Sequence, residues 1–263
     1  IAQNVAVKPG NYIAFERAYK YPNDMKTYDA IVIGAGQAGG PLAKKLALAG
    51  KKTALIERRY VGGTCVNDGC TPTKTWVASA KAAYMAVKSK DLGVSAKSFK
   101  VDMRQIKKCT DQIVMPAWNG NQKAIEATKN LDMIFGDASF TGEKTITVKL
   151  KKGGKLELKA EQVFLNTGCH TIIPDIEGLN EIEYLTSTTI LDLDKVPEHL
   201  LVIGGNYIGL EFGQMFRRFG SKVTMLEKGP RIVAREDEDV SEEVTHILEE
   251  EKIKILTGSQ AIK

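Results

Sequence analysis

Two cysteines in this sequence, Cys65 and Cys70, lie close enough to act together, within the stretch GGTCVNDGCTPTK of residues 62–74. The residues after Cys70 lead into a helical pattern, so the pair is predicted to lie at a helix start, where partial positive charge favours a thiolate. Asp68 lies between the cysteines, and its carboxylate would oppose a thiolate unless it points to water, as we expect. The arrangement favours a redox-active dithiol.

Two other interpretations of the cysteine pair stay open. A zinc site normally needs four ligands, and the remaining candidates, Cys109, Cys169 and His170, form no second pair at ligand spacing. A structural disulfide would close a loop too small to constrain the chain much. The sequence has four cysteines, few enough to be typical of a reducing compartment. We therefore expect no metal site and a cytoplasmic protein.

A dinucleotide-binding unit precedes the cysteines. Residues 28–59 read YDAIVIGAGQAGGPLAKKLALAGKKTALIERR, which predicts a strand, a glycine turn, a helix and a second strand ending at Glu57. In this pattern Gly34 permits a tight turn, Gly36 lets the backbone approach a pyrophosphate, and Gly39 lets helix and strand pack closely. Glu57 can accept hydrogen bonds from an adenosine ribose. The alternative is a glycine-rich turn that serves packing alone.

The same pattern returns in residues 200–230, which read LLVIGGNYIGLEFGQMFRRFGSKVTMLEKGP. Four residues recur at an offset of 170 positions, which indicates a repeated unit: Gly204, Gly209, Gly220 and Glu227 match Gly34, Gly39, Gly50 and Glu57. Asn206 replaces the middle glycine, and its side chain would crowd an approaching pyrophosphate. An apolar stripe at helical spacing is expected to pack against the sheet: Phe212, Met215, Phe216 and Phe219.

The segments between the two units complete an α/β fold. Helices are predicted over about residues 72–90 and 102–130, with an interruption near Pro116. Residues 144–159, KTITVKLKKGGKLELK, alternate as a β-hairpin does. The apolar run of residues 163–165 is expected to return to the first sheet. We predict two Rossmann-type domains, the first with a helical insert and a small antiparallel β-meander.

Composition argues against several classes of function. The chain has 263 residues, enough for about two domains. Its net charge is +5 and its lysine pairs are scattered without interleaved aromatic residues, so we expect no binding of nucleic acid. The sequence has no run of about 18 apolar residues, so we predict no membrane span. The first 24 residues lack the pattern of a secretory signal.

Two dinucleotide units and one dithiol indicate a series of electron carriers. A disulfide does not readily accept a hydride from nicotinamide, whereas a flavin can accept one and pass electrons to sulfur. The cysteines directly follow the first unit, so we place FAD there and NAD(P)H in the second. We predict an N-terminal extension over residues 1–25, an FAD-binding domain over 26–175, and an NAD(P)-binding domain over 176–263.

The stretch GGTCVNDGCTPTK, together with both glycine motifs, resembles the redox signature of the class I pyridine nucleotide–disulfide oxidoreductases. This family includes dihydrolipoamide dehydrogenase, glutathione reductase and mercuric reductase, and the resemblance covers about residues 26–263. The stretch NDGCTPTKTWVASAKAAY is most similar to mercuric reductase-like proteins. The resemblance implies a small-molecule disulfide or metal-ion substrate, with a dihydrolipoamide dehydrogenase-like enzyme as an alternative. A flavoprotein without dithiol chemistry and a non-catalytic binding protein are the alternatives from other classes.

The resemblance also implies roles for individual residues. Cys70 would be the charge-transfer thiolate nearest the flavin, and Cys65 the interchange thiol that attacks substrate. Lys74 would lie near flavin N5 and form an ion pair with Glu211. Tyr207 resembles the ring that shields the flavin until nicotinamide displaces it, although ordinary surface packing would also explain a tyrosine there.

Further positions are expected to contact the cofactors. Those for FAD are Gly34, Gly36, Ala38, Gly39, Glu57, Gly63, Thr64, Lys74, Ala138, Thr167 and Gly168, and those for the nicotinamide nucleotide are Gly204, Asn206, Tyr207, Gly209 and Glu227. A carboxylate at Glu227 would bond the ribose hydroxyls of NADH and repel the extra phosphate of NADPH. Lys228 and Arg231 weaken that argument, so we expect NADH, with NADPH possible.

The family pattern extends beyond the part that matches this chain. It continues with the rest of the nicotinamide domain and a C-terminal dimer-interface domain that supplies a His/Glu acid–base pair. His170, His199 and His246 match no position of that pair. The resemblance implies a fragment, truncated in the second domain and unable to turn over alone, of a homodimer formed through a domain missing here. Cys169 and His170 follow NTG, where the family usually has small residues, and we expect neither to be catalytic.

Overall fold

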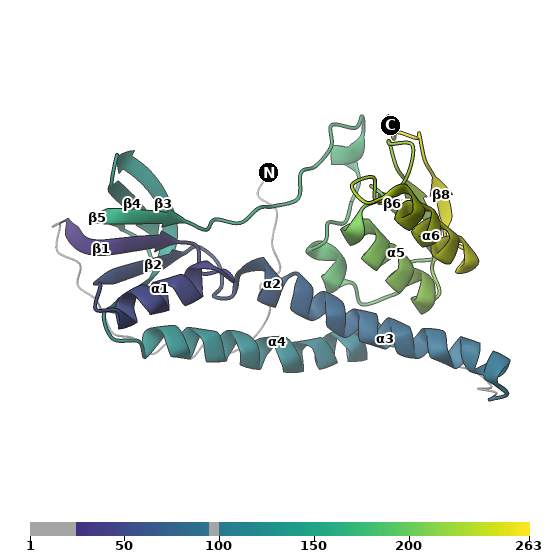
Figure 1. The fold of residues 1–263 in the computed structure, drawn as a ribbon, viewed down its shortest axis with the longest axis horizontal. Coiled ribbons are helices and arrows are strands. Elements are labelled where there is room, and N and C mark those ends of the chain that lie inside the picture. Colours follow the sequence, from purple (N-terminus) through teal and green to yellow (C-terminus); the bar gives the residue numbers. More distant parts are fainter. Residues whose placement is uncertain (1–24, 95–99) are drawn as a thin grey trace.

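The computed structural model describes residues 25–94 and 100–263, so the predicted N-terminal extension lies outside the described residues except for Met25. Each predicted nucleotide unit forms its own sheet. One long helix, Met103–Glu126, extends from below the first sheet toward the second unit, and another, Cys70–Lys88, lies below the second unit (Figure 1). The α/β class predicted from the sequence is therefore confirmed. The boundary near residue 176 stays a prediction, and it falls in the irregular segment that joins the two sheets.

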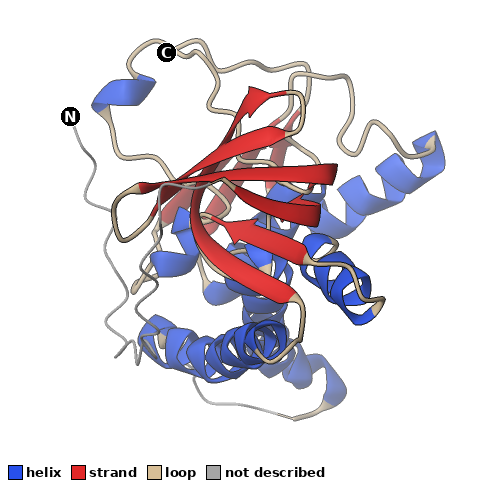
Figure 2. Cartoon of the chain, turned by 90° about the vertical axis from the view of Figure 1, so that its left-hand side faces the viewer, coloured by secondary structure: helices blue, strands red, loops and turns tan. Residues whose placement is uncertain are grey.

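The first sheet contains five strands: β1 (Lys26–Ile33), β2 (Thr53–Glu57), β3 (Leu131–Gly142), β4 (Thr145–Leu150) and β5 (Lys155–Leu165). β1 pairs in parallel with β2 and β5, and Ile31 is the register partner of both Ala54 and Val163. β4 pairs in antiparallel fashion with β3 and β5, which confirms the hairpin. Because β3 and β5 take part in both arrangements, the five strands close into a ring (Figure 2).

Apolar side chains fill this ring and cover its outer face. The inward-pointing residues of the hairpin are fully or almost fully buried: Ile146, Val148, Leu156 and Leu158. Helix α1 (Gly39–Leu48) packs on the other side of the sheet through Ala43 and Ala47, which contact the cluster around Val32 and Leu55. Small alanines allow the helix to approach closely, so α1 begins directly above the end of β1.

The inserted helices are α2 (Gly63–Asn67), α3 (Cys70–Lys88), the short helix η1 (Ser89–Leu92) and α4 (Met103–Glu126). Helix α4 is continuous through Pro116, so the predicted interruption is wrong. A proline inside a helix frees the carbonyl four residues earlier, here that of Gln112. Both residues are exposed, so water can satisfy that carbonyl and the helix tolerates the proline.

The second unit forms a smaller sheet. Its elements are the short helices η2 (Leu179–Glu181) and η3 (Thr189–Asp192), then β6 (His199–Ile203), α5 (Tyr207–Phe219), β7 (Lys222–Leu226), α6 (Glu238–Glu250) and β8 (Lys254–Leu256). The three strands are parallel in the order β6-β7-β8. The predicted apolar stripe of α5 is buried, as expected: Phe212, Met215, Phe216 and Phe219.

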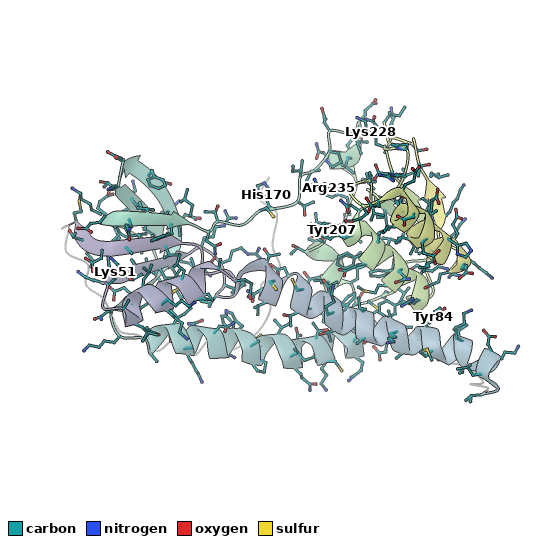
Figure 3. The ribbon with its side chains drawn as sticks, viewed as in Figure 1. Lys51, Tyr84, His170, Tyr207, Lys228 and Arg235 are labelled. Atoms are coloured by element: carbon teal, nitrogen blue, oxygen red, sulfur yellow. The ribbon has the colours of Figure 1, made fainter. Side chains whose placement is uncertain are left out.

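Helix α3 belongs to the core of the second unit, whereas α4 contributes to the cores of both regions, with Met103 in the second and Ile125 in the first. Helix α3 starts just after α2, and its turns pack on α5 (Figure 1). Trp76 is buried with its ring centroid 6.1 Å from that of Phe216 and 6.4 Å from that of Phe219. Further along, the Arg218 guanidinium lies 4.4 Å from the ring centroid of Tyr84, which Figure 3 labels beneath the second unit. Helix α3 therefore links the cysteine region to the second nucleotide unit.

None of the helices in the described ranges combines the length and the apolar character needed to cross a membrane.

Candidate functional site

The first glycine turn is tight enough to require glycine at two of its positions. Gly34 has φ +102°, and a Cβ there would lie 2.1 Å from the carbonyl oxygen of Asn166. A Cβ on Gly39 would lie 1.9 Å from the carbonyl oxygen of Gly34. The chain therefore reverses sharply from β1 into α1, and the amino end of α1 lies at the carboxyl edge of the sheet.

The amino end of α1 is open to an anion. Its N-cap, Ala38, offers no side-chain hydrogen bond, and the first turn has no acidic residue. The redox loop approaches this end through backbone alone, since a Cβ on Gly63 would lie 2.8 Å from the Cα of Gly36. An end without a side-chain cap, a favourable helix dipole and the backbone approach of Gly63 fit the pyrophosphate of a dinucleotide.

Glu57 and Glu227 hold equivalent positions at the ends of β2 and β7. The Glu57 carboxylate accepts hydrogen bonds from the amides of Ala35 at 2.9 Å and Arg59 at 2.7 Å. Glu227 accepts from the amides of Gly205 and Gly229, both at 2.7 Å. The hydrogen-bond donors of the two carboxylates are therefore also 170 positions apart. In each unit, one of these hydrogen bonds attaches the carboxylate to its glycine turn.

The second glycine turn repeats the first with one change. Gly204 has φ +106°, and a Cβ on Gly209 would lie 2.2 Å from the Gly204 carbonyl oxygen. Asn206 is the N-cap of α5, and its side chain accepts a hydrogen bond from the Tyr207 amide at 2.8 Å. A side chain thus caps the amino end of α5, whereas no side chain caps that of α1, where the Gly40 amide donates to the Gly36 carbonyl oxygen at 3.1 Å.

The other expected FAD contacts lie at or beyond the same sheet edge. Thr167 and Gly168 leave β5 beside Gly34, since the Thr167 amide nitrogen lies 3.4 Å from a Cβ placed there. Ala138 lies three residues beyond Phe135, the register partner of Glu57. Thr64 is exposed on α2. Whether these residues contact a cofactor stays a prediction.

Asn166 is a site residue that the sequence reasoning missed. Its side-chain amide donates to the carbonyl oxygen of Gly34 at 3.3 Å, and its backbone amide donates to Ile33 at 2.8 Å. It therefore fixes the turn from the end of β5, the strand next to β1. The signal available in the sequence was its position directly before Thr167, which was itself expected to contact FAD.

The two cysteines lie on consecutive helices, Cys65 on α2 and Cys70 as the first residue of α3, both as free thiols. Cys65 hydrogen-bonds to Cys70, and this bond, followed by burial and the charge on Cys70, raises the pKa of the Cys65 thiol above its ordinary value. A hydrogen bond from the Cys70 amide acts in the opposite direction. The proton is therefore retained on Cys65, and the Cys70 sulfur lies at the positive end of a 19-residue helix.

Two side chains anchor the loop between the cysteines. The Asn67 amide donates to the carbonyl oxygens of Val61 at 3.0 Å and Gly63 at 2.9 Å. The Asp68 carboxylate pairs with the Arg59 guanidinium at 2.7 Å, and the Asp68 side chain is 17% exposed. The expectation that Asp68 points to water is therefore wrong, because an arginine from the turn after β2 lies within reach.

The predicted ion pair between Lys74 on α3 and Glu211 on α5 is present. Lys74 follows Cys70 by one helical turn, and Glu211 follows Tyr207 by one helical turn, so the pair connects the cysteine helix to the second glycine turn. Tyr207 is 65% exposed at the start of α5 (Figure 3). The roles of these residues toward a flavin stay predictions.

The remaining cysteines and the neighbouring histidine lie elsewhere. Cys109 is on α4, 3.4 Å from the side-chain amide of Gln105. Cys169 and His170 are exposed in the segment after β5 (Figure 3). Within residues 25–94 and 100–263, no three His, Cys, Asp or Glu side chains gather as metal ligands would.

Two nucleotide-binding turns joined by a helix that starts at a cysteine pair define a class of protein. Residues 28–263 match the family described as pyridine nucleotide-disulphide oxidoreductase, and the chain belongs to that family. It is 35% identical over 232 residues to mercuric reductase from Bacillus cereus. It is 34% identical over 246 residues to dihydrolipoyl dehydrogenase from Acholeplasma laidlawii.

A solved structure has the same arrangement. The Cu(II) complex of the HOCl-induced flavoprotein disulfide reductase RclA from Escherichia coli matches 90% of this chain with a TM-score of 0.77 at 35% identity. The chain spans 50% of the RclA chain, 36% of the mercuric reductase and 70% of the dihydrolipoyl dehydrogenase.

Proposed function

We propose that the protein is an FAD-dependent NAD(P)H oxidoreductase that passes electrons to the Cys65–Cys70 pair and from there to a small-molecule disulfide or a metal ion. The observation that carries the proposal is the path of α3. This helix begins at Cys70, in the loop whose Gly63 approaches Gly36 of the first glycine turn, and its Lys74 pairs with Glu211, one turn inside α5. This path supports a dithiol that exchanges electrons with a cofactor held by the first unit and is linked through α3 to the second.

The first cradle supports FAD as the resident cofactor. The open end of α1 would hold the pyrophosphate, and Glu57 would accept bonds from the adenosine ribose. FAD would supply a carrier able to accept a hydride from nicotinamide and release electrons to sulfur.

The cysteines support a defined two-electron step. Addition of one hydride equivalent to the oxidised pair breaks its S–S bond and gives one thiolate and one thiol. The raised pKa of Cys65 favours the proton there, and the start of α3 stabilises the negative charge at Cys70. Cys65 would then attack one sulfur of the substrate disulfide as a thiolate and form a mixed disulfide, while its proton goes to the substrate thiolate that is released. Attack by Cys70 on Cys65 would reform the Cys65–Cys70 bond and release the second substrate thiolate.

The second unit supports NADH as the preferred nucleotide. The Glu227 carboxylate is held at the end of β7, where it would meet the adenosine ribose. The Arg231 guanidinium donates to the carbonyl oxygens of Ala234 at 3.5 Å and Glu236 at 3.1 Å. Because Arg231 is engaged in these bonds, it is less available to bind the additional ribose phosphate of NADPH. Lys228 is exposed, so NADPH stays the alternative (Figure 3).

The names of the relatives support two substrate classes. A mercuric reductase and a Cu(II) complex of a flavoprotein disulfide reductase favour a mercuric reductase-like enzyme that acts on a metal ion. A dihydrolipoyl dehydrogenase at similar identity supports a disulfide substrate instead. We further propose a cytoplasmic homodimer, on the resemblance alone.

Anaerobic titration with NADH tests the proposal. The FAD-loaded protein should gain two alkylatable thiols after one equivalent of NADH, and a Cys65→Ser, Cys70→Ser double variant should gain none. Equal thiol counts before and after NADH, with the flavin fully reduced, would contradict electron transfer to the pair.

A further inference from the structure

A carboxylate lies inside the redox loop itself. Asp68 is three residues after Cys65 and two before Cys70, at the junction of α2 and α3. An uncompensated negative charge in this loop would oppose the formation of a thiolate on a neighbouring sulfur. The protein compensates this charge with Arg59, whose guanidinium contacts the Asp68 carboxylate at 2.7 Å.

Arg59 is itself held by the nucleotide unit. Its backbone amide donates to the Glu57 carboxylate at 2.7 Å, so the turn after β2 fixes where its side chain starts. Asn67 ties the same loop to the carbonyl oxygens of Val61 and Gly63. The position of the Asp68 charge relative to the sulfurs is therefore set by two separate attachments.

Other charged groups surround the loop, and most have partners among themselves. Lys107 and Asp192 form an ion pair at 2.9 Å, and both line a small cavity against Asp68 together with Asp111. Lys74, one turn after Cys70, pairs with Glu211. Lys107 and Lys74 are each committed to another carboxylate, so loss of Arg59 would leave the Asp68 charge without its direct counter-ion.

We propose that Arg59 is a positioning residue of the redox centre, which neutralises Asp68 and so keeps the Cys65–Cys70 dithiol reactive at neutral pH. The inference rests on the proposed redox role of the pair. According to this inference, Arg59, in the turn after β2, is one of the residues that determine how readily the two thiols react.

The test compares Arg59→Gln, Asp68→Asn, the Arg59→Gln, Asp68→Asn double variant and the wild type, all FAD-loaded and reduced with dithiothreitol. Iodoacetamide alkylation of the two cysteines is followed by mass spectrometry from pH 5 to pH 10. Arg58→Gln is the matched control, because Arg58 is the adjacent exposed arginine.

Arg59→Gln is expected to react about five-fold more slowly than the wild type at pH 7, and the difference should narrow as the pH rises toward 10, because a larger share of the thiols is then ionised in both proteins. The double variant should return to within about two-fold of the wild type, because the unpaired carboxylate is gone. Asp68→Asn should react at least as fast as the wild type, and Arg58→Gln should match it.

Two results would overturn the inference. One is an unchanged pH profile in Arg59→Gln, and the other is a double variant as slow as the single variant, which would mean that Arg59 acts through packing. A wild type that shows no NADH-dependent thiol formation would instead contradict the proposed function, and it would leave the alkylation comparison intact.

Discussion

The ammonium group of Lys74 pairs with the carboxylate of Glu211, although the two residues are 137 positions apart in the sequence. Lys74 lies one turn inside the helix that starts at Cys70, and Glu211 lies one turn inside the helix that starts at the second glycine motif. The ion pair therefore joins the dithiol to the nicotinamide unit through two helix starts.

Replacing Lys74 by methionine should impair electron transfer far more than stability. The Lys74 and Glu211 side chains are 59% and 38% exposed, and an ion pair this exposed is worth at most about 1 kcal/mol. Loss of a fixed positive charge beside the reacting groups should slow NADH-driven reduction about ten-fold or more. Thermal unfolding and stopped-flow absorbance measure the two effects.

Lys107→Met is the control for this variant, because it removes another lysine of an ion pair, that with Asp192. Equal slowing in both variants would mean that Lys74 has no special part in the reaction.

Gly39→Ala should abolish FAD binding, and Gly40→Ala should not. A Cβ on Gly39 would lie 1.9 Å from the carbonyl oxygen of Gly34, whereas a Cβ on Gly40 would meet its nearest atoms at 3.8 Å. The first change should cost about 2 kcal/mol or more in the free energy of unfolding. The second should be neutral or stabilise by about 0.5–1 kcal/mol, since alanine favours a helix. Denaturant unfolding and flavin content after purification are the measurements, and FAD retention by Gly39→Ala contradicts the cradle.

Asn206→Gly should tighten the binding of NADH. The Asn206 side chain occupies the Tyr207 amide at the start of α5, and its removal frees that donor for a phosphate oxygen. One hydrogen bond of about 0.5–1.5 kcal/mol corresponds to a Kd about 2- to 10-fold lower. Isothermal titration with NADH measures the change. A higher Kd in this variant than in the wild type would show that the asparagine itself binds the nucleotide.

Cys70→Ala should make Cys65 ionise at lower pH. The hydrogen bond to Cys70 is the largest cause of the raised pKa of Cys65, followed by burial and the charge on Cys70. The variant removes the first and third causes, so the pKa falls back toward the ordinary value for a thiol, and the alkylation of Cys65 should start at lower pH than in the wild type. A profile that moves to higher pH would contradict the hydrogen-bonded pair.

The parts of the fold that follow from local rules were predictable. Gly34 and Gly204 both need positive φ, and a glycine pattern between strand and helix signals that requirement directly. The stripe of Phe212, Met215 and Phe216 predicted the buried face of α5, because helical periodicity alone fixes which residues share a face.

The parts that depend on distant residues were not predictable from single motifs. The contact of Asp68 with Arg59 depends on where the turn after β2 places an arginine, and no spacing rule gives that. Asn166 supports Gly34 from 132 positions away. The interruption expected at Pro116 is absent because solvent can replace the missing hydrogen bond, and exposure at that position is a tertiary property.

The most direct test of electron transfer through the dithiol is the absorbance spectrum of the FAD-loaded protein after anaerobic addition of NADH. A thiolate at Cys70 beside an oxidised flavin should give a broad band at wavelengths longer than the flavin's own, and Cys70→Ser should lack it while Cys65→Ser keeps it. A band that persists in Cys70→Ser would contradict the account.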